Sequence, residues 1–80
     1  MIVDIVMPRL SDTMTEGYIA GWHKAVGDQV SVGEDLVDID TDKATVSHES
    51  GQSGVLVEVL AQVDDVVKVG AVIARIEIAV

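Results

Sequence analysis

An internal repeat is the feature that most limits how this chain can fold. Residues 17–40 align without a gap to residues 54–77 of the 80 residues. Apolar residues match even where identity is lost, and the identical pairs include Gly17 and Gly54, Asp28 and Asp65, Val30 and Val67, and Gly33 and Gly70. Two similar halves that each bury one apolar face pair most simply about an approximate two-fold axis. We therefore expect two small, equivalent sheets.

The apolar pattern indicates that these sheets are built from short antiparallel strands. Apolar and polar residues alternate in residues 1–8, 17–24, 55–63 and 72–80, and Gly, Asp and Ser clusters separate the runs. Valine is the commonest residue, and β-branched side chains favour strands over helices. No window has a sustained helical period. The fold class expected is all-β.

A lone cation in an acidic stretch marks the middle of the chain, in "TDKAT", residues 41–45. A two-residue connection made by Asp42 and Lys43 would place Lys43 at the tip of an exposed hairpin. Asp42-Lys43 lacks the glycine that an ideal primed turn prefers, so the turn type stays open. The expected cross-strand pairs are Thr41 with Ala44, Asp40 with Thr45, Ile39 with Val46, Asp38 with Ser47, and Val37 with His48, which puts apolar side chains on one face and polar ones on the other.

The repeat also predicts where this hairpin lies in the domain. Under the same alignment Val6 falls on Lys43, and Lys43 falls on Val80. The place that matches the hairpin tip is therefore occupied by the two chain termini. We expect the tip and the termini at opposite ends of the molecule.

Charge and composition exclude several functions. Five Lys and Arg residues against fourteen Asp and Glu residues give a formal charge of −9, which repels nucleic acid and anionic membrane surfaces. The chain has no cysteine, so thiol redox chemistry would need a borrowed group. His23 and His48 are far apart and lack ligand spacing, so no metal is expected. A domain of this size is too small for a deep catalytic cleft, and no catalytic residue is assigned.

The chain also shows no targeting segment. The first ten residues contain Asp4 and have no basic start, unlike a signal peptide, and no apolar run approaches the length of a membrane helix. We expect a soluble intracellular domain, in the cytoplasm of a bacterium or the mitochondrial matrix of a eukaryote.

Three stretches carry a family resemblance: "MPRLSDTMTEG" (7–17), "GDQVSVGEDLVDIDTDKAT" (27–45) and "VGAVIARI" (69–76). Together they closely resemble the lipoyl domain of the acyltransferase component of 2-oxo acid dehydrogenase complexes, the pyruvate type most of all. The resemblance covers nearly the whole chain. It implies a flattened β-barrel of two four-stranded antiparallel sheets with an internal pseudo-two-fold repeat, forming a single carrier domain over residues 1–80 within a longer acyltransferase chain.

The same resemblance implies a covalent modification. Lys43 would be amide-linked to lipoic acid by a lipoate-protein ligase or lipoyl transferase, with Asp42 and Ala44 as recognition residues. A free lysine amine is protonated at neutral pH, so modification needs an enzyme that binds and deprotonates it. A loop beside the hairpin would be read by the decarboxylase, and it consists of Arg9, Leu10, Ser11, Asp12, Thr13 and Met14.

The function implied is that of a swinging-arm carrier with no catalysis of its own. Its partners would be a thiamine-diphosphate-dependent 2-oxo acid decarboxylase, the acyltransferase catalytic domain and a flavin-dependent dihydrolipoyl dehydrogenase. The isolated domain is expected to be monomeric. The alternatives are a biotinyl carrier domain, which would more typically have methionines beside the lysine, and an unmodified protein-interaction module.

A few residues depart from the family pattern or need a separate interpretation. Asp64 stands where the family often has glycine and matches Gly27 in the repeat, so a strained but intact turn is expected. His48 falls on the apolar side of its strand and would need a partner or a solvated edge. Tyr18 and Trp22 are expected at the core or its edge.

Overall fold

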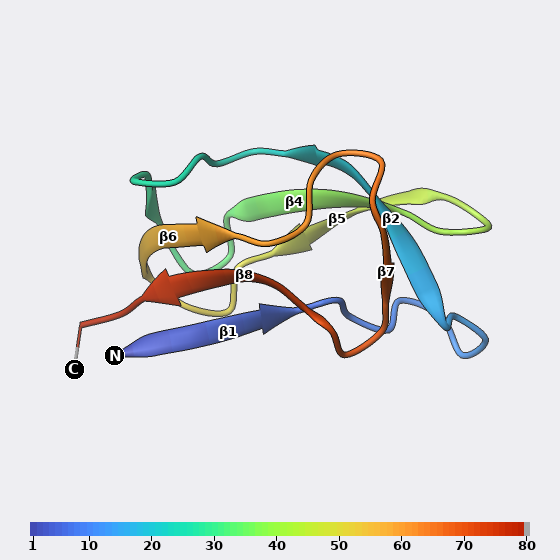
Figure 1. Cartoon of the computed structure of the whole chain (residues 1–80), viewed down its shortest axis with the longest axis horizontal. Helices are drawn as coiled ribbons and strands as arrows, with labels where there is room; N and C mark the ends of the chain where they lie inside the picture. Colours follow the sequence, from blue (N-terminus) through green and yellow to red (C-terminus); the bar gives the residue numbers. More distant parts are fainter. Residues whose placement is uncertain (80) are drawn as a thin grey trace.

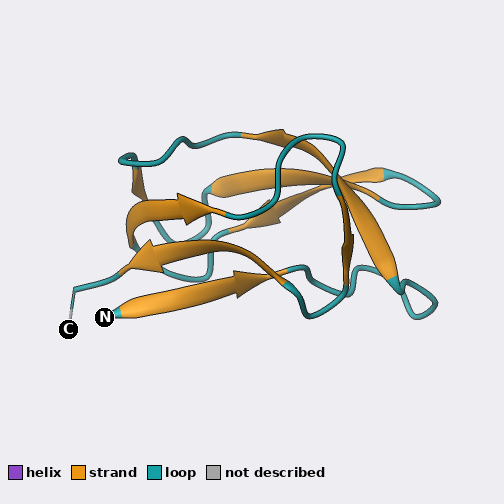
Figure 2. Ribbon diagram, in the orientation of Figure 1, coloured by secondary structure: helices purple, strands orange, loops and turns teal. Residues whose placement is uncertain are grey.

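The computed structural model describes residues 1–79, and all regular structure in them is β. Figure 2 shows strands and loops without helix. The strands, labelled in Figure 1, are β1 (Ile2–Val6), β2 (Glu16–Trp22), β3 (Gln29–Val30), β4 (Asp35–Asp40), β5 (Thr45–Glu49), β6 (Gly54–Val59), β7 (Val66–Lys68) and β8 (Val72–Glu77). In this described part of the chain, no helix is long and apolar enough to cross a membrane.

The strands form two four-stranded sheets, as predicted, ordered β1-β8-β6-β3 and β5-β4-β2-β7. Every pairing in them is antiparallel. The order shows how the repeat is used: β2 and β4 match β6 and β8, and β3 matches β7. The short strand of each half, β3 or β7, pairs in the sheet formed by the other half, so neither half is a separate unit.

The turns of the two halves are closed by equivalent hydrogen bonds. Asp28 accepts from the backbone N–H of Ala25 at 2.9 Å, and Asp65 accepts from that of Gln62 at 2.8 Å. Side-chain oxygens of aspartate commonly close such turns. The recurring aspartates of the repeat therefore serve the fold.

The backbone before each of these aspartates is left-handed. Gly27 has a φ of 98°, and Asp64, at the matching position, has a φ of 74°. Asp64 is the one non-glycine residue with positive φ in the described chain. The expected strained turn is confirmed, since aspartate tolerates this conformation better than most residues.

The core lies between the two sheets and is almost wholly aliphatic. Its buried side chains come from both halves, from β1 and from the segment between β1 and β2, and they are Ile5, Met7, Met14, Ile19, Val30, Leu36, Val37, Ile39, Leu56, Ala61, Ile73, Ala74 and Ile76. Burial of such side chains supplies roughly 1.5–3 kcal/mol each before the entropy cost of folding.

Two glycines allow close approaches inside this core. A Cβ on Gly17 would lie 2.8 Å from Met14 Cε and 2.9 Å from Ile39 Cγ2. A Cβ on Gly54 would overlap the backbone carbonyl oxygen of Glu77. A Cβ at Gly17 would require neighbouring side chains to shift, and one at Gly54 would require the backbone of Glu77 to shift.

The aromatic residues behave differently from each other. Trp22 is partly buried, packs against the core and donates its indole N–H to the carbonyl of Ala61 at 2.9 Å. Tyr18 was expected at the core or its edge, and this is wrong: it is 50% exposed on the outer face of β2. The inward positions beside it are Gly17 and Ile19, so the strand's alternation sends Tyr18 outward.

Candidate functional site

The β4–β5 hairpin has the predicted register. Asp40 pairs with Thr45, Ile39 with Val46, Asp38 with Ser47, and Val37 with His48. The backbone N–H of Thr41 donates to the carbonyl of Ala44 at 2.9 Å, which leaves Asp42 and Lys43 as the connection. In Figure 1 the tip lies at one end of the molecule, and Met1 and the C-terminal segment lie at the other. The expectation for Val80 itself falls outside the described residues.

The side chain of Thr41 organises the tip. Its Oγ1 donates to the carbonyl of Ala44 at 2.9 Å and accepts from the backbone N–H groups of Lys43 and Ala44, at 3.2 and 3.1 Å. These bonds stabilise a connection that has no glycine. The sequence interpretation missed this role, although a threonine at the start of a turn is a recognised signal for it.

The stem below the tip is held by hydrogen bonds between side chains on one face. Asp38 Oδ1 accepts from Ser47 Oγ at 2.7 Å and lies 2.8 Å from His23 Nε2. Thr45 Oγ1 donates to Asp40 Oδ1. The bond from Ser47, followed by that from His23, lowers the pKa of Asp38, so this carboxylate remains charged at neutral pH.

The other face of the stem is less completely covered than predicted. Ile39 is fully buried, but its partner Val46 is 37% exposed. His48 is half-buried and pairs with Val37, and desolvation lowers its pKa. The apolar side chains of β4 therefore enter the core, whereas those of β5, an edge strand, only border it.

Asp42, Lys43 and Ala44 are all exposed. Other cations within residues 1–79 do form ion pairs. Lys24 Nζ lies 3.1 Å from Glu34 Oε2, and Arg75 bridges Asp4 and Glu58. Lys43 takes part in none of the ion pairs of this part of the chain. Its amine therefore projects into solvent without a competing interaction.

The loop Arg9–Met14 connects β1 to β2 at the same end of the molecule as the hairpin tip (Figure 1). The backbone N–H of Leu10 donates to Met14 Sδ at 3.2 Å, and the backbone N–H of Met14 donates to the Ser11 carbonyl at 3.2 Å. Arg9 donates to the Asp12 carbonyl, and Thr13 is exposed. The Oγ atom of Ser11 is buried without a partner, so a side-chain bond from Ser11 does not hold this loop.

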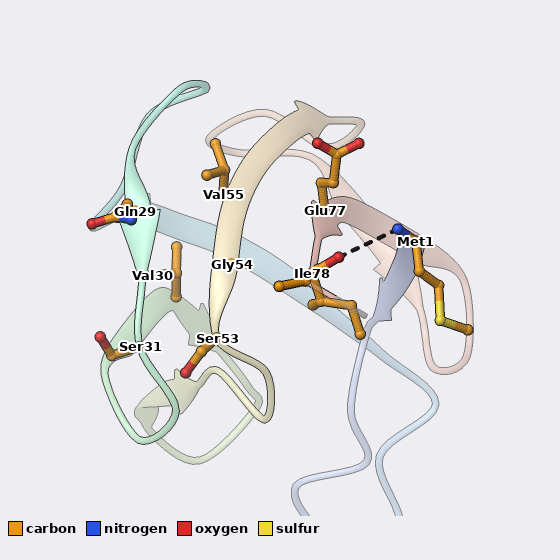
Figure 3. A pocket seen from close by; sticks show the side chains of 10 residues that line it. Met1, Gln29, Val30, Ser31, Ser53, Gly54, Val55, Glu77 and Ile78 are labelled. Atoms are coloured by element: carbon orange, nitrogen blue, oxygen red, sulfur yellow. Dashed lines mark hydrogen bonds between the residues drawn. The ribbon is translucent and has the colours of Figure 1, made fainter.

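An open pocket of about 600 Å³ lies beside Met1 and Ala79. Figure 3 shows Gln29 and Val30 on one side of it and Met1, Glu77 and Ile78 on the other, with Gly54 between them. Its lining does not include the hairpin tip. Among the described residues no group of three or more His, Cys, Asp or Glu side chains could hold a metal ion.

Comparison with known proteins identifies the family. A biotin/lipoyl family model, described as "Biotin-requiring enzyme", matches residues 3–76. The chain is 52% identical over 73 residues to the dihydrolipoyllysine-residue acetyltransferase component of the pyruvate dehydrogenase complex of Corynebacterium glutamicum. It is 46% identical over 71 residues to the dihydrolipoyllysine-residue succinyltransferase component of the 2-oxoglutarate dehydrogenase complex of Staphylococcus saprophyticus.

The matched region is a small part of these relatives. It covers 91% and 89% of this chain but 11% and 17% of the two relatives. The solved lipoyl domain of the 2-oxoglutarate dehydrogenase complex of Azotobacter vinelandii matches with a TM-score of 0.77 and 31% identity, covering 94% of this chain and 95% of that one. The chain therefore belongs to the biotin/lipoyl domain family, and within it is a lipoyl domain of the kind found in acyltransferase components of 2-oxo acid dehydrogenase complexes.

Proposed function

We propose that Lys43 is the attachment point for lipoic acid and that the domain carries acyl groups and reducing equivalents between enzymes. The observation that carries this proposal is the exposed Lys43 at a two-residue hairpin tip, at the opposite end of the molecule from the N-terminus (Figure 1). An attached arm would extend away from the body of the domain. The rigid stem and the Thr41 bonds would fix where the arm begins.

The residues at the tip fit a lipoyl group. An amide on Lys43 would remove its charge without breaking an ion pair, and the neighbouring side chains leave it open to solvent. When bound, the group supplies the disulfide that this cysteine-free chain lacks. The chain's own contribution is to hold Lys43 on an exposed turn, open to solvent.

Lipoic acid is favoured over biotin by the local sequence and by the relatives. Asp42 and Ala44 flank the lysine, where a biotin site would more typically have methionines. The two bacterial relatives are both named as dihydrolipoyllysine proteins. Biotin remains the second candidate, because the matched family covers both modifications.

The partners we propose are the lipoate-protein ligase or lipoyl transferase, the thiamine-diphosphate-dependent decarboxylase, the acyltransferase catalytic domain and dihydrolipoyl dehydrogenase. Residues 1–80 would form one carrier domain of a longer acyltransferase. This carrier domain would have no catalytic residues of its own. Tethering such a domain raises the local concentration of its cargo to the millimolar range. Besides the bacterial relatives, a mitochondrial acetyltransferase component of Arabidopsis thaliana is 49% identical over 72 residues, so a cytoplasmic or matrix location is proposed.

We assign partner recognition to the loop Arg9–Met14. It shares an end of the molecule with the tip of the β4–β5 hairpin (Figure 1), and the unpartnered hydroxyl of Ser11 is available to a group that displaces the local packing. The loop is fixed by Met14, whose sulfur accepts from Leu10. A partner that receives the arm at the tip would also meet this loop.

The test is modification in vitro. The domain is incubated with lipoate ligase, lipoate and ATP, in parallel with biotin ligase, biotin and ATP, and is then analysed by intact mass and peptide mapping. One lipoyl addition on Lys43 is expected. Lys43→Arg should prevent it, while Lys68→Arg, at another exposed lysine, should not. Biotin addition would favour a biotinyl carrier, and addition of neither group to folded protein would leave an interaction module.

A further inference from the structure

The outer face of the hairpin's sheet carries an exposed apolar patch among carboxylates. In the β5-β4-β2-β7 sheet, Tyr18 pairs with Asp40 on one side and with Val66 on the other, and Asp40 pairs in turn with Thr45. Directly paired residues point to the same side of a sheet. These four side chains therefore form one row that crosses the whole outer face.

Two members of this row, Tyr18 and Val66, expose large apolar side chains to solvent. Tyr18 is 50% exposed and Val66 is 49% exposed, on a chain with a formal charge of −9. An exposed tyrosine beside an aliphatic residue is a common centre for a protein contact. The patch is therefore a candidate docking surface.

The carboxylates beside the patch are held in fixed positions. Asp40 Oδ1 accepts from Thr45, and Asp38 Oδ1 accepts from Ser47 while lying 2.8 Å from His23. None of these bonds uses the Oδ2 atoms. Each carboxylate thus has one oxygen anchored and a second available to an incoming donor.

The charges along the face set which side a cation would occupy. Lys68 pairs with Glu16 on the neighbouring row of β7 and β2, away from Asp38. At that end the charges of Lys68 and Glu16 offset each other, whereas the carboxylates of Asp40 and Asp38 would attract a cationic group to the other end. There it would also lie beside the ring of Tyr18, and guanidinium groups bind both carboxylates and aromatic faces.

The position of the face supplies the reason for a partner. Asp40 directly precedes Thr41, whose bonds build the tip that carries Lys43. A protein that accepts an arm from Lys43 brings the rim of its own active site against this stem. This step rests on the proposed carrier function.

We propose that the outer face around Tyr18, Asp38, Asp40 and Val66 docks an arginine-bearing protein surface next to the active site that receives the arm. The guanidinium of the partner would lie between the Asp40 carboxylate and the Tyr18 ring, and Val66 would provide apolar contact. Such a contact is strengthened by charge attraction and weakened by salt.

The test uses a hexa-arginine peptide as the probe and a hexa-citrulline peptide as its uncharged counterpart. Backbone amide shifts of the intact domain are followed by NMR during titration with each peptide. The largest changes are expected at Tyr18, Asp40 and Val66 with arginine only. Tyr18→Ala and Asp40→Asn should each weaken the arginine complex by about threefold or more, as expected for loss of a cation–π or charged contact. Asp40→Asn retains an oxygen for the Thr45 hydroxyl.

The matched control is Glu77→Gln, which removes one exposed carboxylate from the opposite sheet. It should bind arginine like the parent. The docking proposal is overturned if all three variants bind equally, if the shifts centre elsewhere, or if citrulline binds as well. All samples are also given to lipoate ligase. Lipoylation without selective arginine binding would overturn the docking proposal alone. Selective arginine binding without lipoylation would overturn the proposed carrier function alone.

Discussion

Thr41 bonds to the carbonyl of Ala44 twice, through its backbone N–H and through its side-chain hydroxyl, each at 2.9 Å. The same hydroxyl accepts from the two backbone N–H groups that follow Asp42. Lys43 is therefore presented by a turn whose geometry depends on its neighbour's side chain.

Thr41→Ala should loosen this turn. The loss of the hydroxyl removes a donor and an acceptor on an exposed site, so the free energy of unfolding should fall by about 1 kcal/mol. Lipoylation of Lys43 should also slow, because the ligase then meets a disordered tip. Chemical denaturation and initial rates measure both effects. Thr41→Ser, which keeps the hydroxyl, should retain most of the stability and most of the lipoylation rate. Equal stability and equal rates for the two variants would contradict the role assigned to Thr41.

Lys43→Ala should change modification without changing the fold. The side chain is exposed and makes no ion pair within residues 1–79. The free energy of unfolding should stay within about 0.5 kcal/mol of the parent, as for other surface substitutions. Denaturant titration checks this, and a clearly larger loss would mean that Lys43 is structural.

Gly54→Ala should be strongly destabilising. The added Cβ would overlap the carbonyl oxygen of Glu77, which cannot move without breaking the pairing of β6 and β8. A loss of about 3 kcal/mol or more is expected, at the upper end for overpacking. Gly21→Ala is the control, since its Cβ would meet nothing within 4 Å and its φ is not positive. Similar melting temperatures for Gly54→Ala and Gly21→Ala would argue against a close approach of Gly54 to the carbonyl of Glu77.

Asp64→Gly should stabilise the domain slightly. Asp64 has a φ of 74°, where glycine has no steric penalty. The relief of strain should exceed the added entropy of the unfolded chain by about 0.5 kcal/mol. The converse change at the matching turn, Gly27→Ala, should destabilise, since Gly27 has a φ of 98°. Thermal unfolding of the two variants should therefore shift in opposite directions, and a shift in the same direction would contradict the account.

His48 should make stability depend on pH. Desolvation lowers its pKa in the folded protein below the ordinary value of 6.5, although the charge of Glu49 opposes this. The unfolded chain therefore binds a proton more readily, and stability should fall as the pH drops through about 6.5, levelling off below the folded pKa. His48→Gln should flatten this part of the curve. An unchanged slope in denaturation at several pH values would show that His48 is not responsible.

The sequence by itself predicted much of the candidate site because the relevant signals are local. Alternating residues on both sides of Asp42 and Lys43 admit one register that buries Ile39 and Val37, and the structure has that register. The alternation did not show that β5 is an edge strand. Val46 and His48 are consequently more exposed than their place in the pattern indicates.

The hydrogen bonds that organise the hairpin tip and the loop Arg9–Met14 could not be predicted from the hydrophobic pattern, for a different reason. Thr41 was identified as a strand residue, and its use as a turn residue depends on the side-chain rotamer. The N–H to sulfur bond between Leu10 and Met14 depends on how Met14 packs under its own loop. Hydrophobic periodicity carries no information on either.

The sequence determined that the domain has two equivalent halves with a lysine opposite its termini, because a gapless repeat forces matched elements into matched places. Only the tertiary structure decided that β3 and β7 exchange between the halves and that Tyr18 faces outward beside Asp40. The physical reason is that strand neighbours and face assignments follow from long-range backbone pairing and from which side of each sheet meets the shared core.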